Sequence, residues 1–244
     1  MLTYRSGEDL RIFVLTGAGI SAESGLKTFR DNDGLWETHR VEDVATPEAF
    51  ARDPELVQRF YNERRAALSE VEPNAAHRAL GTLQKTLRER GGELVLVTQN
   101  VDDLHARGGA TNVIHMHGEL KGGLCAVCDF RWDVDSALTP QTACLACRTV
   151  GTARPDIVWF GEMPYHMDRI EAELAQADQF VSIGTSGAVY PAAGFVQTAR
   201  ANGLRTLELN LEPSLGSAWF DESRHGPAGT VVPEWVRGVL ADLG

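Results

Sequence analysis

Four cysteines, all between positions 125 and 147, form the most specific chemical pattern in the sequence. Cys125 and Cys128 make one C-x-x-C pair, and Cys144 and Cys147 make a second, with fifteen residues between the pairs. This is the spacing of a zinc ribbon, in which four thiolates surround one tetrahedral ion and leave no open coordination position. We therefore expect one structural Zn²⁺. Redox dithiols or separate core cysteines are the alternatives, but a redox C-x-x-C needs no matching second pair.

A glycine-rich turn at residues 17–22 (GAGISA) fits the G-x-G-x-x-G/A pattern and follows a predicted strand. Glycines let the backbone approach a pyrophosphate, whose charge then meets the N–H groups at the start of the next helix. The motif is weak alone, because glycine turns often follow strands. A dehydrogenase also needs an acidic residue about 20 residues further on, at the end of its second strand. Glu42 and Asp43 lie near that distance but outside any predicted strand. Simple hydride transfer is therefore disfavoured, and residues 210–212 (NLE) could contact a ribose instead.

Polar side chains follow two other apolar runs. His117 comes after residues 113–114 (VI) and before a glycine, which places it at the carboxyl end of a strand. Imidazole exchanges protons near neutral pH, so this position suits a general base, although most histidines serve surface or core packing. Asn100 and Asp102 follow residues 93–97 (ELVLV) and could bind a ligand, cap a helix, or do both.

These residues need strands and helices to position them, and the hydrophobic pattern predicts such a scaffold. Apolar runs predict strands at residues 11–15, 94–97, 113–114, 180–183 and 206–209. Helical stretches alternate with them at residues 54–68, 74–90 and 191–201. This alternation indicates an α/β protein with a Rossmann-like parallel sheet and helices on both faces, where ligands bind beyond the carboxyl ends of the strands.

The cysteine segment interrupts this pattern, so we expect two domains. Residues 1–118 and 156–244 would form the dinucleotide-binding domain. Residues 119–155 would form an inserted small zinc-ribbon domain, with residues 26–70 packing nearby.

The composition is that of an ordinary globular protein, with 43% hydrophobic and 23% charged residues. A formal net charge of −11 repels nucleic acid and anionic lipid, so neither is an expected partner, while basic protein segments are tolerated. The N-terminus lacks a signal-peptide pattern, and no run reaches the roughly 20 apolar residues of a membrane span. We expect a cytoplasmic protein. The sequence does not determine the oligomeric state and is compatible with a monomer.

The motifs also occur in a distinctive order along the chain. They are GAGISAESGLKTFR (17–30), TQNVDDLHARGG (98–109), HMHGEL (115–120), the paired C-x-x-C, VWFGE (158–162), GTSGAVYP (184–191) and LNLEP (209–213). This series resembles the sirtuin family over nearly the whole chain, and within it the bacterial desuccinylase-type (class III) members. The resemblance implies an NAD-dependent protein-lysine deacylase. NAD and an acyl-lysine protein substrate would meet in the cleft between the two domains, and nicotinamide and O-acyl-ADP-ribose would be released.

The resemblance further implies roles for individual residues. His117 would be the catalytic base that deprotonates a ribose hydroxyl. Val158, Phe160 and Gly161 would pair with the substrate backbone. For Phe29, ordinary core packing is the alternative. NAD would be bound by Gly17, Ala18, Gly19, Ile20, Ser21, Ala22, Glu23, Phe29, Arg30, Trp36, Gln99, Asn100, Val101, Asp102, Gly184, Thr185, Ser186, Asn210, Leu211, Glu212 and Ala228.

The acyl preference depends on the predicted helix at residues 54–68, where Tyr61 and Arg64 share one face at positions i and i+3. That face is otherwise apolar, so Arg64 needs an anionic partner, and a carboxylate on the acyl group would match its guanidinium. Arg65 is interpreted as an ordinary solvated residue. The Tyr-x-x-Arg pair and the small Ala45 resemble desuccinylase-type sirtuins, which implies removal of succinyl and malonyl as well as acetyl groups. Alternatively, Arg64 pairs with a neighbouring surface glutamate.

Two other functions share parts of this pattern. An ADP-ribosyltransferase or NAD hydrolase would keep the NAD residues but would not need an acyl-lysine channel, and VWFGE together with Tyr61 and Arg64 argues against it. A catalytically silent NAD-sensing or zinc-stabilised binding module would be expected if His117 or Asn100 were replaced, and neither is.

Overall fold

The computed structural model describes residues 10–26, 35–36 and 39–243, with only the backbone described at residues 35–36. At its centre is a parallel sheet of six strands in the order β11-β10-β9-β1-β4-β5. In chain order this is the 3-2-1-4-5-6 arrangement of a doubly wound sheet, so the winding reverses between β1 and β9. The five predicted strands are all present, within one residue at each end. The six strands are β1 (Arg11–Thr16), β4 (Glu93–Thr98), β5 (Ile114–His115), β9 (Gln179–Ile183), β10 (Arg205–Asn210) and β11 (Glu222–His225).

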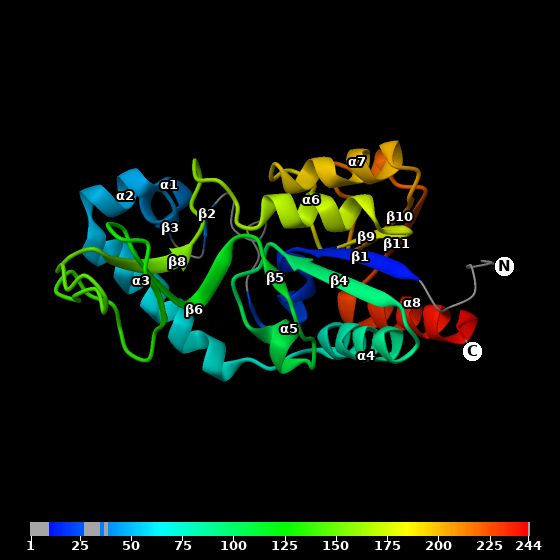
Figure 1. Cartoon of the computed structure of the whole chain (residues 1–244), viewed down its shortest axis with the longest axis horizontal. Coiled ribbons are helices and arrows are strands. Elements are labelled where there is room, and N and C mark those ends of the chain that lie inside the picture. The colour runs from blue at the N-terminus through cyan, green and yellow to red at the C-terminus, as the bar shows by residue number, and fades with distance from the viewer. Residues whose placement is uncertain (1–9, 27–34, 37–38, 244) are drawn as a thin grey trace.

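Helices cover both faces of this sheet (Figure 1). One face carries α6 (Met167–Ala175) and α7 (Phe195–Ala201), and the other carries α4 (Ala75–Glu89) and α8 (Ala228–Asp242), which lie side by side. Neighbouring residues of a strand point to opposite faces. Phe13 of β1 therefore packs under the first pair of helices, and Val14 packs under the second pair. The predicted Rossmann-like α/β fold is confirmed.

α4 shows how the local sequence starts a helix. The side-chain oxygen of Asn74 accepts the N–H groups of Ala76 (2.9 Å) and His77 (3.4 Å). The N–H of Asn74 in turn donates to Nδ1 of His77 (3.3 Å). This reciprocal capping box satisfies N–H groups that the first turn leaves without partners. Leu80 and Leu87 then face the core, so the cap and the apolar stripe both specify this helix.

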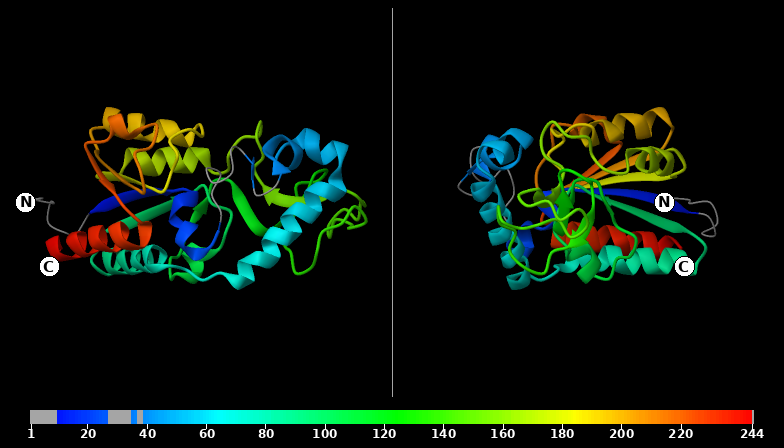
Figure 2. Two further views of the ribbon diagram at one scale, coloured as in Figure 1. Left: turned by 180° about the vertical axis from the view of Figure 1, so that it is seen from behind. Right: turned by 60° about the vertical axis from the view of Figure 1, so that its left-hand side comes forward.

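A smaller part of the molecule lies beyond the carboxyl ends of the sheet strands (Figures 1 and 2). Val57 and Phe60 share a core cluster there with Leu120 and Ile157, so the helices of residues 41–67 pack on the sheet that carries the cysteines. The predicted domain limits remain predictions. The small antiparallel sheet that carries Cys125 agrees with the expected zinc ribbon. Its strands, in the order β7-β6-β8, are β6 (Gly118–Cys125), β7 (Arg131–Asp133) and β8 (Ala153–Ile157). The other elements are β2 (Leu35–Trp36), β3 (His39–Arg40), α1 (Val41–Val44), α2 (Pro47–Arg52) and α3 (Pro54–Ala67).

Three features differ from the expectations. Two short 3-10 turns (Ala18–Ile20 and Ala22–Ser24), and not an α-helix, follow the glycine loop. Gly25 ends the second turn in a left-handed conformation with a φ of 96°. α7 starts later than predicted, because another 3-10 turn (Ala192–Gly194) precedes it. The sequence analysis did not predict β11, α6, α8 or the single-turn helix α5 (Leu104–Arg107), and of the elements in the smaller part it predicted only α3. Among the helices that the structure describes, none is long and apolar enough to cross a membrane.

Candidate active site

Two loops meet where the winding of the sheet reverses, at the carboxyl ends of β1 and β9. The N–H of Gly17 donates to the carbonyl of Ile183 (2.9 Å), and the N–H of Gly19 donates to the carbonyl of Gly184 (2.9 Å). A Cβ on Gly19 would lie 2.8 Å from the Cα of Gly184, which is closer than real Cβ contacts. Gly184 itself has a φ of 63°, a conformation that side chains disfavour. The direct contact between the two backbones therefore requires glycine on both sides.

Replacing Gly19 with alanine should destabilise the protein, because the new methyl group would overlap the backbone of Gly184. We expect a loss on the order of 1–3 kcal/mol, measured as a lower midpoint of thermal unfolding. Gly238→Ala is the matched control: it lies inside α8, where a Cβ meets no atom within 4 Å. It should gain about 0.5–1 kcal/mol, the usual difference between alanine and glycine in a helix. If the unfolding midpoints of Gly19→Ala and Gly238→Ala shifted in the same direction, the close contact between Gly19 and Gly184 would not be the reason that glycine is required.

A buried polar network begins at Ser21, just after the glycine loop. Its hydroxyl donates to Oδ2 of Asp102 (3.0 Å) and accepts from Nδ2 of Asn100 (3.1 Å). The same hydroxyl lies 3.3 Å from Nε2 of His77. Because Nδ1 of His77 accepts the N–H of Asn74, the proton of the neutral ring belongs on Nε2 and faces Ser21. The network ties the loop after β4 to both the glycine loop and α4.

Burial determines the charge of this network. It lowers the pKa of His77 to about 4, with a smaller contribution from the charge of Arg78, so His77 is neutral at physiological pH. Burial also raises the pKa of Asp102 above its ordinary value, although hydrogen bonds from the Leu104 N–H and from Ser21 oppose this rise. His77 is thus a fixed hydrogen-bond donor that brings no charge into the site.

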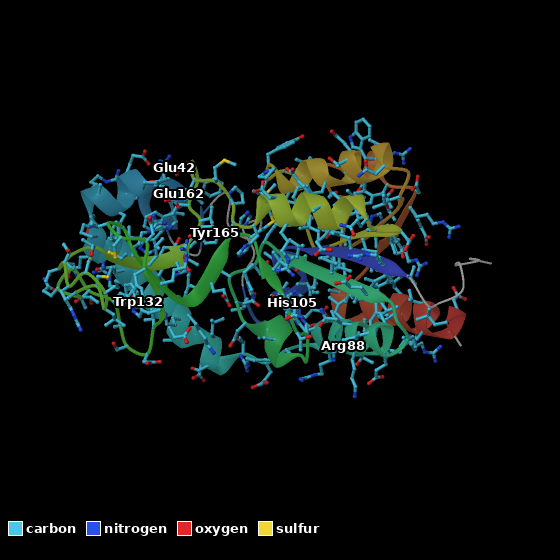
Figure 3. The ribbon with its side chains drawn as sticks, in the orientation of Figure 1. Glu42, Arg88, His105, Trp132, Glu162 and Tyr165 are labelled. Atoms are coloured by element: carbon cyan, nitrogen blue, oxygen red, sulfur yellow. The ribbon has the colours of Figure 1, made fainter. Side chains whose placement is uncertain are left out.

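A second chain of buried groups runs from α5 to the loop after β4. Nε2 of His105 lies 2.9 Å from Oγ1 of Thr16, which donates to Oγ1 of Thr98 (2.8 Å). Oγ1 of Thr98 accepts the backbone N–H of Asn100 (3.0 Å). His105 lies near the middle of the molecule (Figure 3), and burial lowers its pKa well below the ordinary value of a histidine. These groups together support the backbone that carries Asn100.

His117 stands at the turn between β5 and β6. Its Nδ1 lies 3.1 Å from the carbonyl oxygen of Gln99, so Nδ1 carries a proton and donates it. Nε2 is then the unprotonated nitrogen of the neutral ring. Burial lowers the pKa of His117 below its ordinary value, and the hydrogen bond to Gln99 offsets this only in part. A neutral imidazole with one nitrogen fixed as a donor has the arrangement of a general base.

The segment expected to bind the substrate backbone lies beside His117. The N–H of Val158 donates to the carbonyl of His117 (2.9 Å), and the N–H of Phe160 donates to the carbonyl of Ala45 (3.0 Å). Ala45 is buried, whereas the side chain of Phe160 is exposed. Among the hydrogen bonds between described residues, none uses the carbonyl of Val158 or the N–H of Gly161. Both groups thus lack a hydrogen-bond partner among the described residues, and their pairing with a substrate backbone remains a prediction.

Tyr61 and Arg64 both lie on α3, but in different surroundings. Tyr61 is buried, and its hydroxyl accepts the indole N–H of Trp159 (2.9 Å). Burial raises the pKa of Tyr61 far above its ordinary value, so the phenol stays protonated. Arg64 is half-buried, and its guanidinium carbon lies 3.4 Å above the ring of Phe60. Nη1 of Arg64 also donates to the Phe60 carbonyl (3.1 Å), which fixes the direction of the side chain.

The interpretation of Arg65 as an ordinary solvated residue was wrong. Nε of Arg65 donates to the carbonyl of Leu120 (2.7 Å), and Nη1 donates to Oδ1 of Asn62 (2.8 Å). Its guanidinium thereby holds α3 on β6, and burial lowers its pKa. The helix pattern could not show this, because the main partner is a backbone carbonyl 55 residues away in the sequence.

The four cysteines come together in the small part of the molecule. Their sulfur atoms all lie within 4.8 Å of one another. The Cys125–Cys147 and Cys128–Cys144 sulfur pairs are each 3.7 Å apart. Four thiolates bound at about 2.3 Å to one tetrahedral Zn²⁺ would be separated by about 3.8 Å. The cluster therefore fits this ion, and a metal with four sulfur ligands would be structural.

Comparison with known proteins agrees with this geometry. The model of the Sir2 family matches residues 17–191. The chain belongs to the Sir2 family. An NAD-dependent protein deacylase of Caulobacter vibrioides is 58% identical over 234 residues, which cover 96% of this chain and 98% of that protein. Another, from Shigella flexneri, is 57% identical over 238 residues, which cover 97% of this chain and 86% of that protein. The crystal structure of a Sir2 homologue in complex with NAD has a TM-score of 0.86 at 41% identity, and the match covers 96% of this chain and 91% of that one.

Some of the residues that the sirtuin resemblance assigns to NAD continue the site toward β10. Nδ2 of Asn210 donates to the carbonyl of Thr185 (2.8 Å), so the loops after β9 and β10 are joined. Ser186 lies in the same loop, and its hydroxyl accepts the N–H of Ala188 (3.2 Å). Leu211 and the next residue, Glu212, are exposed. Their roles toward NAD remain predictions.

The side chain of Glu23 contacts the start of α8. Its carboxylate accepts the N–H of Gly229 (2.6 Å), beside Ala228 in the first turn of that helix. Negative charge is favourable at a helix N-terminus, so this contact stabilises the start of α8. In this Sir2 chain Glu23 therefore has a structural contact in addition to its predicted role as an NAD ligand. Phe29 and Arg30 lie outside the described residues, as does the side chain of Trp36.

Sequence reasoning missed two buried histidines of this Sir2 site. His77 had a local signal, because an asparagine followed three residues later by a side-chain acceptor at a helix start is a capping-box pattern. His105 had none, because its partner Thr16 is 89 residues away.

Proposed function

We propose that this chain is an NAD-dependent protein-lysine deacylase that removes acetyl, succinyl and malonyl groups, with His117 as its general base. The position of His117 carries the proposal. Its Nδ1 is held by Gln99, and its carbonyl binds Val158 of the segment assigned to the substrate. The names of the Caulobacter and Shigella relatives support the activity. The proposed products are nicotinamide and O-acyl-ADP-ribose.

NAD fits the edge of the sheet where the loops after β1 and β9 meet. The NAD complex of the Sir2 homologue supports this assignment. Ser21, Asn100 and Asp102 offer a compact set of hydrogen-bonding groups for the nicotinamide and ribose end. Asn210 and Ala228 would line the adenosine end. Bound NAD would supply the ribose whose hydroxyl oxygen carries the acyl group in O-acyl-ADP-ribose.

The residues of the chain supply binding, orientation and one proton transfer. His117 would accept a proton at Nε2 from a ribose hydroxyl, because Nδ1 is already committed to Gln99. The threonine pair and His105 keep the Asn100 backbone in place, so the loop beside His117 keeps its shape. The four cysteines would hold one structural Zn²⁺, away from the proposed chemistry.

The succinyl and malonyl part of the proposal depends on Tyr61 and Arg64. A carboxylate at the end of the acyl chain accepts hydrogen bonds, and a guanidinium and a protonated phenol can both donate them. The raised pKa of Tyr61, caused by its burial, keeps the phenol a donor. The buried Ala45 supports the same assignment, because its small side chain leaves room for a longer acyl group.

Arg64→Met should raise KM for succinyl-lysine peptides by about 10- to 150-fold, which corresponds to the loss of one charged hydrogen bond. The KM for acetyl-lysine peptides should change far less, because the acetyl group has no carboxylate. Arg59→Met is the control, since Arg59 is exposed on the same helix. Steady-state kinetics on matched peptides measures both effects. Equal losses on the two substrates, or a wild-type chain that never removes succinyl groups, would contradict the assignment.

The function as a whole is tested by mass spectrometry of the products from acetyl- and succinyl-lysine peptides, each with and without NAD. Deacylated peptide with O-acyl-ADP-ribose, formed only with NAD, is the expected result. Consumption of NAD that is independent of the peptide would favour the NAD hydrolase, and ADP-ribose attached to the peptide would favour the ADP-ribosyltransferase.

A further inference from the structure

A partly buried ion pair joins β8 to the segment that leads to α6. Glu162 lies in this segment, on the smaller part of the molecule (Figure 3). Arg154 meets it with both terminal nitrogens: Nη1 donates to Oε1 (2.7 Å), and Nη2 donates to Oε2 (2.9 Å). Nη2 also donates to the carbonyl of Ile157 (2.7 Å). Two-pronged pairing fixes the relative orientation of both side chains. We call Arg154 and Glu162 the clamp.

Trp159 is held by both partners of the clamp. Its backbone N–H donates to Oε2 of Glu162 (2.9 Å), and the guanidinium carbon of Arg154 lies 3.5 Å above its ring. The ring is buried and also packs near Phe50, with 5.4 Å between the ring centroids. The clamp therefore determines both the backbone position and the ring orientation of Trp159.

Trp159 connects the clamp to the acyl side of the site. Its indole N–H donates to the hydroxyl oxygen of Tyr61 (2.9 Å). A phenol that accepts at its oxygen directs its own hydrogen to a different acceptor. The neighbours of Trp159 in the chain, Val158 and Phe160, are bound to the carbonyls of His117 and Ala45. One residue thus links the acyl pocket and the peptide-pairing segment.

The clamp is charged and mostly enclosed. The side chain of Arg154 is 9% exposed, and that of Glu162 is 29% exposed. Burial would raise the pKa of Glu162, but the hydrogen bonds from Arg154 and from the Trp159 N–H lower it, so Glu162 stays ionised. Enclosed ion pairs add little net stability compared with apolar residues of the same size, although loss of one partner is costly. The geometry that this pair imposes explains its presence better than stability does.

We propose that Arg154 and Glu162 are positioning residues that act through Trp159 on both the peptide-pairing segment and the acyl pocket around Tyr61. This inference rests on the proposed deacylase function and extends it to residues that do not touch the reacting groups. None of the clamp contacts described above involves the glycine loop or the loop after β4. A weakened clamp should therefore impair use of the acyl peptide and spare NAD.

Glu162→Gln is the main test, because it keeps the size of the side chain while removing its charge and one acceptor oxygen. KM for acyl-lysine peptides should rise by about 10-fold or more, as expected for a lost charged hydrogen bond. The values of kcat and of KM for NAD should stay within about two-fold of the wild type, because the clamp touches neither NAD loop nor His117 Nε2. Asp43→Asn is the matched control: it breaks an exposed ion pair with Arg52 (2.8 Å) in the same part of the molecule and should change nothing.

Trp159→Phe is the second variant, because it removes the indole N–H but keeps an aromatic ring. It should raise KM for succinyl-lysine peptides more than for acetyl-lysine peptides, since the N–H orients Tyr61. If Glu162→Gln fails to fold, the kinetics of Trp159→Phe decide. Equal KM changes on the two acyl groups in Trp159→Phe would overturn the proposal.

Anisotropy of a fluorescent succinyl-lysine peptide measures binding without turnover, and so separates the clamp from the proposed function. A wild-type chain that binds this peptide but removes no acyl group would refute the function, while a weaker peptide affinity in Glu162→Gln would still support the clamp. A wild-type chain that does not bind the peptide would refute both. An unchanged peptide KM in Glu162→Gln, or an equal rise in KM for NAD, would overturn the clamp. The clamp would also be overturned if the loss of peptide affinity in Glu162→Gln were explained by a lower unfolding midpoint of that variant.

Discussion

Replacing His117 with alanine should lower kcat/KM for acyl-lysine peptides by about 10²–10⁴-fold, the range for loss of a general base. The fold should survive, because the ring is only half-buried and its Nδ1 bonds to a backbone carbonyl, that of Gln99. Product formation with NAD measures the first effect, and the unfolding midpoint measures the second. His225→Ala is the control, since that side chain is 37% exposed on β11 and faces Glu208. Full turnover by the His117→Ala variant would show that His117 is not the general base.

The pH profile of kcat/KM checks the same residue. A general base works in its neutral form, so the rate should fall as the pH drops through the pKa of the folded protein. Burial lowers the pKa of His117 below 6.5, and the hydrogen bond to Gln99 offsets this only in part. The acid limb of the profile should therefore have its midpoint below pH 6.5. At pH values above that midpoint, kcat/KM should no longer depend on the protonation of His117. An acid limb centred well above 6.5 would point to a different base.

Zinc removal should have the largest effect on stability. The purified protein should contain about one zinc ion per chain, because the four sulfur atoms all lie within 4.8 Å of one another, close enough to bind a single ion. In small zinc modules the binding free energy, about 10–16 kcal/mol, is also folding free energy. Cys144→Ser, which alters a buried ligand, should abolish stoichiometric zinc and lower the unfolding midpoint of the small part of the molecule.

Leu145→Ser is the control for this variant, because Leu145 lies beside Cys144 but its side chain is 52% exposed. It should keep both zinc and the midpoint. Elemental analysis and thiol titration test the site directly. A protein with four free thiols, no zinc and an unchanged unfolding midpoint would disprove it.

The parts of the fold that could be predicted are those with local signals. The helix that begins after Asn74 could be predicted, because its apolar stripe and its cap lie within a few residues of one another. β11 was not, because its sequence ESRH has no apolar residue and the strand is held at the sheet edge by backbone pairing with β10. α8 contains Pro233 and two glycines, which argue against a helix. Packing of Val232 and Trp235 into the core overrides them.

The same distinction holds for the site. The glycine loop, the paired C-x-x-C and the H-M-H segment are contiguous motifs, and together they predicted the Sir2 family correctly. The contacts of Arg65 and His105 join residues far apart in the chain, so no spacing rule reveals them. The two residues of the clamp are only eight positions apart, but their proposed role depends on Trp159 and on the distant Tyr61. The individual ligand roles, the cytoplasmic location and the oligomeric state remain predictions.

The backbone contact between the loops after β1 and β9 has a consequence for the thermodynamics of ligand binding. Fixing the backbone of one residue costs about 1–2 kcal/mol of conformational entropy. Here Gly17 and Gly19 are already hydrogen-bonded to Ile183 and Gly184, so their backbone entropy is lost when the chain folds and not when a ligand binds. For a dinucleotide that binds at this edge of the sheet, the glycine loop would already be ordered before binding. Any ordering of the backbone that accompanies binding must then take place in other segments, and the conformational entropy that the protein loses on binding is lost there.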